Sequence, residues 1–275
     1  MNKYIHHLVT VVLIIVISSL ATAAWATAQP RLTGIAIATR TKAALEPDRP
    51  STRTITVRIY RGAREVMRWT GAEARDSVNG ASYMVTVMLA PSEARGLAIL
   101  ARQADSRPPQ MWTYVPAVHR VEMLTPTAEF APMFGSDFSF SDLGFIEMRS
   151  TYNYLGEVTR DNVKTYEIEE LPTNNPYYTK IIAWIRQSNY LPLERDFYDY
   201  MSKPVDIESY PEVQDIDGIP TVIRIKMVNQ HSGNSTEFDF SNIRYGNRAP
   251  AALFNPENLP IIAKEPFLKS GNGRQ

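Results

Sequence analysis

The chain has 275 residues, of which 44% are hydrophobic and 21% are charged, and this is the composition of an ordinary globular protein. Its 29 basic residues equal its 29 acidic residues, which argues against a nucleic-acid-binding protein, since that class usually carries a basic excess. The sequence has no cysteine, so disulfides, iron–sulfur clusters, thiolate zinc sites and cysteine nucleophiles are excluded.

The N-terminus has the pattern of a secretory signal peptide. Lys3 precedes the apolar run Leu8–Leu20, and Ala26–Ala28 follows as a small-residue cleavage site. The competing interpretation is an uncleaved membrane anchor, but the apolar run is shorter than the roughly 20 residues that span a bilayer. We therefore predict that residues 1–28 are removed and that residues 29–275 form a periplasmic protein. No cysteine follows the apolar run, so no lipid anchor is expected.

Strand-like segments follow soon after this region. A short helix is expected over Gly34–Leu45, and Thr52–Tyr60 then alternates apolar and polar side chains like a half-buried antiparallel strand. Short turns lead to further expected strands at Glu65–Trp69 and Leu97–Arg102. Ser82–Leu89 is apolar on both faces, so we expect it at the centre of a sheet or beneath a helix.

The stretch Gln110–Leu143 has a pattern of its own. Met111–Val115 and Val121–Leu124 form a predicted hairpin with Pro116 at its corner. In the following run, turn-prone residues alternate with large aromatic residues, which are Phe134, Phe138 and Phe140. Residue types alone favour a loop whose aromatic rings plug the core, because large apolar side chains are usually buried. The alternative is one wall of an apolar pocket.

Strands resume at Met148–Thr159 and continue through short hairpins to Thr236–Ile243. Prolines deny regular structure beyond Arg248, apart from one helical turn at Pro256–Leu259. The series amounts to about eleven strands with little helix. Such connectivity predicts a mainly β fold with one large, curved antiparallel sheet, because a flat open sheet of this width rarely persists.

The sequence offers no catalytic or metal-binding constellation. His119 and His231, the histidines outside the predicted signal peptide, lie in predicted turns without ligand partners at close spacing. A glycine-rich phosphate loop and a Gly-x-Ser-x-Gly elbow are both missing. Ser136 beside Asp137 has no histidine placed to complete a triad. We therefore expect no enzyme activity, no metal and no cofactor.

Several motifs resemble those of the LolA-like family of outer-membrane lipoprotein-sorting proteins, in its longer, less characterised branch. The most specific is Trp112-x-Tyr114-x-Pro116 followed by Phe134-Gly-Ser-Asp-Phe138. Weaker matches follow in chain order: Pro91 with Arg95 and Gly96; Pro192 and Leu193 with Arg195, Tyr198 and Asp199; Asp217 with Gly218; Met227 with Asn229, Gly233 and Thr236; and Ile243 with Tyr245. The resemblance covers about 52–259, nearly the whole predicted mature chain.

This resemblance implies an unclosed β-barrel of about eleven antiparallel strands, with a few short helices as a lid over an apolar concave face. It also implies a carrier that binds the acyl chains of a lipid or lipoprotein and moves them toward the outer membrane. An inner-membrane RND-type transporter is the implied partner. One other class stays open: a non-catalytic periplasmic accessory module whose cavity is filled by its own side chains.

Two sets of candidate binding residues follow from the carrier interpretation. The candidates for the lining of an apolar cavity are Trp69, Trp112, Tyr114, Phe134, Phe138, Phe140 and Trp184. The candidates to contact a lipid head group are Arg95, Arg120 and Lys180, and the competing interpretation of each is a surface or strand-edge charge. The volume left empty inside the sheet distinguishes the carrier from the accessory module.

Overall fold

The computed structural model describes residues 32–104, 107–125, 128–143, 149–173, 175–246 and 248–264. The predicted signal peptide, residues 1–28, lies outside this part of the chain. The strands are β1 (Ser51–Arg61), β2 (Arg64–Val78), β3 (Ala81–Ala90), β4 (Ala98–Ala104), β5 (Arg107–Val115), β6 (Arg120–Met123), β7 (Ser150–Arg160), β8 (Val163–Pro172), β9 (Lys180–Arg186), β10 (Pro192–Tyr198), β11 (Pro204–Ile216), β12 (Ile219–Asn229) and β13 (Ser235–Tyr245).

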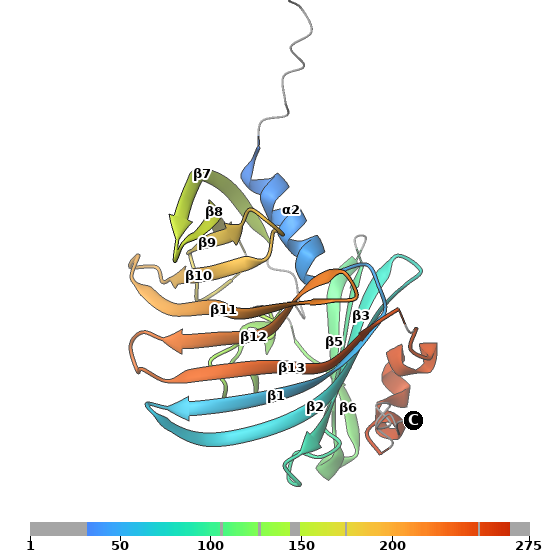
Figure 1. Cartoon of the computed structure of the whole chain (residues 1–275). Coiled ribbons are helices and arrows are strands. Elements are labelled where there is room, and N and C mark those ends of the chain that lie inside the picture. The colour runs from blue at the N-terminus through green and yellow to red at the C-terminus, as the bar shows by residue number, and fades with distance from the viewer. Residues whose placement is uncertain are drawn as a thin grey trace, which may run out of the picture. The chain divides into compact units, whose positions relative to one another are not determined.

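All of these strands join one strongly curved sheet in the order β6-β5-β4-β3-β2-β1-β13-β12-β11-β10-β9-β8-β7 (Figure 1). Each neighbouring pair is antiparallel. The predicted fold class, a curved and unclosed antiparallel sheet, is confirmed. The described chain holds 13 strands rather than about eleven. The pairing of β1 with β13 joins the two halves of the sequence, and every other pair is a sequential hairpin neighbour.

The helix predicted over Gly34–Leu45 is present with these bounds as α2. It begins where the side-chain oxygen of Thr33 accepts a hydrogen bond from the Ala36 amide at 3.2 Å, a common N-cap. The helix packs on β7, β8 and β12 and covers one end of the concave side of the sheet (Figure 1). Gly34 permits this approach, because a Cβ there would lie 2.7 Å from the backbone of Tyr152.

The convex side of β3, β4 and β5 is covered by the C-terminal part of the described chain, η4 (Ala251–Phe254), η5 (Pro256–Asn258) and α3 (Leu259–Ile262) (Figure 1). The buried cluster between them consists of Ala74, Val85, Val87, Ala98, Leu100, Tyr114, Leu253, Phe254, Leu259, Ile262 and Ala263. These strands are therefore buried on both faces, as the two apolar faces of Ser82–Leu89 predict. Of the two places expected for that segment, the one beneath a helix is confirmed, because β3 is the fourth strand from the β6 edge of the sheet and not its centre. No helix of the described residues is both long enough and apolar enough to span a membrane.

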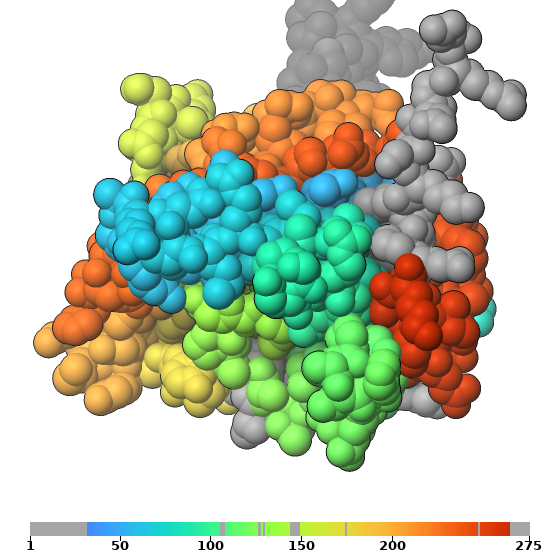
Figure 2. Space-filling model, turned by 90° about the horizontal axis from the view of Figure 1, so that it is seen from below, coloured from blue at the N-terminus to red at the C-terminus, as the bar shows by residue number. Residues whose placement is uncertain are grey.

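The segment between β6 and β7 runs from one edge of the sheet to the other, because these consecutive strands are its two edges. It contains η2 (Ala128–Phe130) and η3 (Met133–Gly135). Its aromatic rings enter the concave core, where Phe138 lies edge-on to Phe238 at 5.0 Å between ring centroids. Figure 2 shows the green residues of this part of the chain on the underside of the molecule.

Candidate functional site

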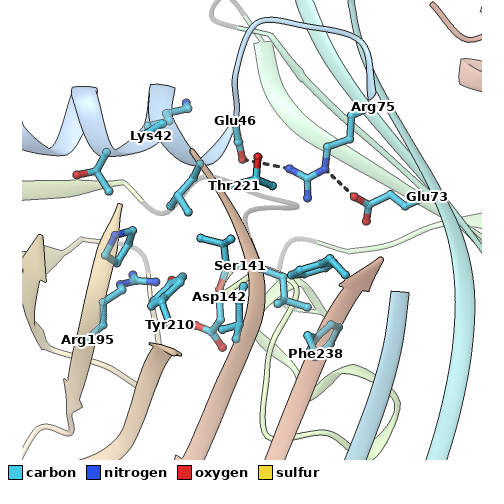
Figure 3. A pocket seen from close by; sticks show the side chains of 18 of the residues that line it. Lys42, Glu46, Glu73, Arg75, Ser141, Asp142, Arg195, Tyr210, Thr221 and Phe238 are labelled. Atoms are coloured by element: carbon cyan, nitrogen blue, oxygen red, sulfur yellow. Dashed lines mark hydrogen bonds and ion pairs between the residues drawn. The ribbon is translucent and has the colours of Figure 1, made fainter. Parts of the chain in front are cut away.

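A cavity of about 240 Å³ lies between α2 and the concave face of the sheet (Figure 3). Its apolar lining comes mainly from inward-facing strand residues, among them Ile55, Trp69, Met88, Ile99, Ile168, Ala183, Ile185, Val222, Phe238 and Phe240. The helix contributes the small side chains of Ala38, Thr41 and Ala44, together with the larger Lys42 and Leu45. Because three of these five side chains are small, α2 covers the cavity without filling it.

A second hollow of about 390 Å³ adjoins the first, beneath the C-terminal end of α2 and the chain that leaves it. The two share part of their lining, namely Lys42, Leu45, Glu46, Arg53, Arg75, Gln103 and Tyr245. The apolar cavity therefore adjoins the second hollow at the C-terminal end of α2, and charged residues form the wall that the two share.

That charged wall is an ion cluster centred on Glu73, whose side chain is 1% exposed. Arg53 reaches Glu73 Oε1 through Nη2 at 2.6 Å, and the Nε of Arg75 reaches the same oxygen at 2.7 Å. Burial raises the pKa of Glu73, but attraction to the two arginines outweighs it, so the pKa lies below its usual value. Burial lowers the pKa of Arg53 to about 10, against the attraction of Glu73. Arg75 also lies 4.0 Å from Glu46 at the end of α2.

A second charged cluster borders the opposite side of the cavity, around Arg195 of β10 (Figure 3). Arg195 Nη1 lies 2.9 Å from Glu208 Oε2, and its Nη2 lies 3.5 Å from Glu170 Oε2. Asp142 lines the same cavity, and its Oδ2 accepts hydrogen bonds from the Ser139 amide and hydroxyl, both at 2.7 Å. Burial raises the pKa of Asp142, although the hydrogen bonds from Ser139 act to lower it. Burial also raises the pKa of Glu208, to about 7, although the attraction of Arg195 acts to lower it.

Four of the predicted cavity residues come together. Trp69 lines the cavity, and its ring lies edge-on to that of Phe134 at 5.7 Å. Phe134 in turn contacts Phe140 at 6.1 Å, and Phe138 is fully buried in the same core. The three phenylalanines fill the end of the concave side next to the cavity, so the segment between β6 and β7 closes that end. Trp69 lies at the boundary, because it contacts Phe134 and also lines the cavity.

The other three predicted cavity residues lie on the convex face, which corrects their expected position. Trp112 and Tyr114 share one face of β5, as predicted, but they pack in the cluster covered by the C-terminal helices. Trp184 lies between Ala183 and Ile185 in β9, and since these two line the cavity, Trp184 points to the other face of the sheet. The Arg160 guanidinium stacks on it, 3.7 Å from the ring centroid.

The predicted head-group residues lie at the surface rather than against either hollow. Arg95 is exposed in the turn between β3 and β4. Arg120 is 71% exposed and pairs with Glu122 at 3.0 Å. The Lys180 ammonium lies 4.5 Å from the ring centroid of Tyr198. In the described chain no cluster of three His, Asp or Glu side chains is arranged to hold a metal ion.

The charged residues that do border the cavity were not predicted from the sequence. Arg53 is in phase with the inward-facing Ile55, and Arg195 is in phase with the buried Phe197. A charge in phase with buried apolar residues is therefore the signal that could have identified both. Glu73 and Arg75 lie beyond Trp69, where the strand was predicted to end, whereas β2 continues to Val78.

Comparison with known proteins gives a consistent fold. A protein-family model described as "Uncharacterized protein" matches residues 80–260. A DUF1329 family protein from Desulfovibrio piger is 24% identical, with a TM-score of 0.75 over 82% of this chain and 97% of that chain. A putative outer membrane lipoprotein-sorting protein domain from Vibrio parahaemolyticus is 24% identical, with a TM-score of 0.74 over 82% and 98%. A LolA superfamily protein from Nitrosomonas europaea is 19% identical, with a TM-score of 0.64 over 82% and 98%. No curated protein sequence matches the chain.

Proposed function

The chain belongs to the LolA-like family, and from this premise we propose that it is a periplasmic carrier that binds the apolar part of a lipid or acylated protein. The observation that carries the proposal is the hollow beneath α2, bordered by Ile55, Ile99 and Val222. An acyl chain in such a site is held by hydrophobic and dispersion contacts, each buried methylene contributing roughly 0.8 kcal/mol.

The size of the interior supports a small or single-chain ligand. The first hollow, about 240 Å³, is slightly smaller than most small-molecule sites, which span roughly 300–1,000 Å³. The adjoining hollow of about 390 Å³ gives room for the remainder of a longer ligand. Trp69 lines the first hollow and Phe134 contacts its ring, so we expect Trp69 to contact the acyl chain.

A specific observation favours a second candidate function. Phe134, Phe138 and Phe140 already fill one end of the concave side. A protein that needs its sheet only as a rigid docking surface would show this kind of internal filling. The alternative is therefore a non-catalytic periplasmic accessory module without bound lipid.

Native mass spectrometry of the protein purified from its own periplasm without detergent separates the two. A carrier retains a mass that is released as a lipid or an acylated peptide. A protein that is ligand-free, and stays so after incubation with membrane vesicles, contradicts the carrier and supports the accessory module. Transfer toward the outer membrane with an RND-type transporter belongs to the same proposal, and is tested by cross-linking in intact cells.

A matched pair of variants ties any bound mass to the cavity. Ala38 and Ala36 are both half-buried on α2, and Ala38 lines the cavity whereas Ala36 does not. Ala38→Trp places a large ring in the hollow, so we expect it to lower the bound fraction by at least about tenfold. Ala36→Trp should leave the bound fraction unchanged. Equal binding by the two variants would place the ligand elsewhere.

A further inference from the structure

Among the described residues, one carboxylate oxygen on the cavity wall lacks the hydrogen-bond donor that its burial demands. Asp142 is 7% exposed and lines the hollow beneath α2 (Figure 3). Its Oδ2 accepts two hydrogen bonds from Ser139, each at 2.7 Å. Its Oδ1 is buried without a partner among the described residues. Folded proteins rarely leave a buried polar atom unpaired, so this oxygen requires an explanation.

The charges around Asp142 are also unbalanced. Arg195 is the cation that contacts this cluster within the described chain, and it is shared by Glu208 at 2.9 Å and Glu170 at 3.5 Å. Glu208 is fully buried, and its Oε1 likewise has no partner among the described residues. Three buried carboxyl groups thus accompany one guanidinium beside an apolar hollow. Buried charge of one sign is costly unless it is paired or neutralised by a proton.

Asp206 shows what a completed site looks like in the same protein. It is 8% exposed and does not line the cavity. Its Oδ1 accepts a hydrogen bond from Asn229 Nδ2 at 2.9 Å, and its Oδ2 accepts one from the Tyr178 hydroxyl at 3.1 Å. The protein therefore supplies donors to both oxygens of a buried aspartate that faces its own core. Within the described part of the chain, Asp142, which faces the cavity, has a donor for Oδ2 and none for Oδ1.

We propose that the ligand of the cavity carries an ammonium group that binds Asp142. An ammonium both donates the missing hydrogen bond and supplies the positive charge that the cluster lacks, whereas a hydroxyl supplies only the hydrogen bond. A carboxylate would add a fourth negative group and is disfavoured. The inference rests on the proposed function, because it requires the hollow to be a ligand site, and it narrows the cargo to amine-bearing amphiphiles.

Three probes with the same alkyl chain test this directly: dodecylamine and dodecanoate below their critical micelle concentrations, and dodecanol below its solubility limit. Dissociation constants are measured by isothermal titration calorimetry on the protein freed of bound lipid. We expect the amine to bind at least about tenfold more tightly than the acid, with the alcohol between them. Ala38→Trp, which fills the hollow, should abolish this order if the probes bind inside it.

Variants assign the preference to one carboxylate. Asp142→Asn should bring the amine and the alcohol to within about twofold of each other, because the amide keeps its shape but loses the charge. Asp206→Asn, the matched control, should keep the wild-type order. An unchanged preference in Asp142→Asn overturns the assignment to this residue.

The wild-type measurement does not depend on whether any variant folds. Equal binding of the three probes, or tightest binding of dodecanoate, overturns the ammonium proposal and leaves the carrier proposal standing. Failure of all three probes to bind overturns the carrier proposal itself. The two proposals therefore fail in different ways.

Discussion

The two ends of the concave side are built on one sheet but are filled differently. At one end the segment between β6 and β7 inserts Phe138 and Phe140 into the core. At the other end α2 presents Ala38, Thr41 and Ala44 and leaves a hollow of about 240 Å³. Because β1, β2 and β13 contribute side chains to both ends, the covering segment, rather than the sheet, decides where space remains.

The ends also differ in polarity. The filled end is dominated by aromatic edge-to-face contacts, such as that of Phe138 with Phe238 at 5.0 Å. The hollow end carries buried charged groups, including Glu73 and Glu208, which are 1% and 0% exposed. We therefore expect packing to contribute most to stability at the filled end, while the charged groups that could recognise a ligand border the hollow end.

The largest expected effect is on the free energy of unfolding, and it compares a ring at the filled end with one at the hollow end. Phe138→Ala should lower the free energy of unfolding by about 3–5 kcal/mol, because it opens a cavity in a fully packed region. Phe240→Ala at the hollow end should cost less, since its ring already borders empty space and loses fewer contacts. Urea unfolding of both variants measures the difference. Equal losses would show that the hollow end is packed as tightly as the filled end.

Much of the fold could be predicted from the sequence because it depends on local patterns. Alternation of apolar and polar residues identifies strands such as Thr52–Tyr60, which lies within β1 (Ser51–Arg61). Turn residues identify the hairpin corners, and the helix over Gly34–Leu45 has its predicted bounds. The expected strand number, about eleven, is below the observed 13, although even the short β6 (Arg120–Met123) lies where Val121–Leu124 was predicted to form a strand.

The candidate site was harder to predict, because alternation tells which residues share a face but not which face is inside. Trp112 and Tyr114 share a face as expected, yet that face is convex and is covered by residues from the far C-terminal end of the chain. Where both faces of a strand are apolar, the inner one is decided by such distant contacts. The charged lining was missed for a different reason: residues such as Arg195 pattern like surface charges unless their phase is compared with buried neighbours.

The next effect tests the charged side of the hollow end through its pH dependence. Burial raises the pKa of Glu208 from 4.5 to about 7, so the folded protein binds this proton more tightly than the unfolded chain does. Its contribution to stability is therefore fully present below pH 4.5 and is lost as pH rises through about 7. Burial also raises the pKa of Asp142, and it raises the pKa of Asp206 to about 6, so both contribute in the same direction.

We therefore expect the free energy of unfolding to fall between pH 5.5 and pH 8, with Glu208 contributing on the order of 2 kcal/mol of the decrease. Glu208→Gln should flatten the slope, because the amide does not titrate. The same exchange at Glu212, whose side chain is 45% exposed, controls for the general loss of a carboxylate. Parallel pH slopes in wild type and Glu208→Gln would show that the buried glutamate stays charged through this range.

The smallest effect concerns the helix that covers the hollow. Thr33→Ala removes the side-chain oxygen that accepts the Ala36 amide, and should lower the free energy of unfolding by about 1 kcal/mol. Thr39→Ala is the matched exchange within the same helix, where the hydroxyl donates to the Ile35 carbonyl at 2.9 Å. It should be neutral or slightly stabilising, because alanine is the better helix former and no cap is lost.

Hydrogen exchange shows whether the destabilisation caused by Thr33→Ala is confined to α2. If α2 opens independently of the sheet, Thr33→Ala speeds amide exchange over Gly34–Leu45 and leaves the amides of β1 and β13 unchanged. Faster exchange across the whole sheet would mean that α2 and the strands unfold as one unit. In that case the helix could not admit a ligand by local opening, and entry would have to occur through the adjoining hollow at its C-terminal end.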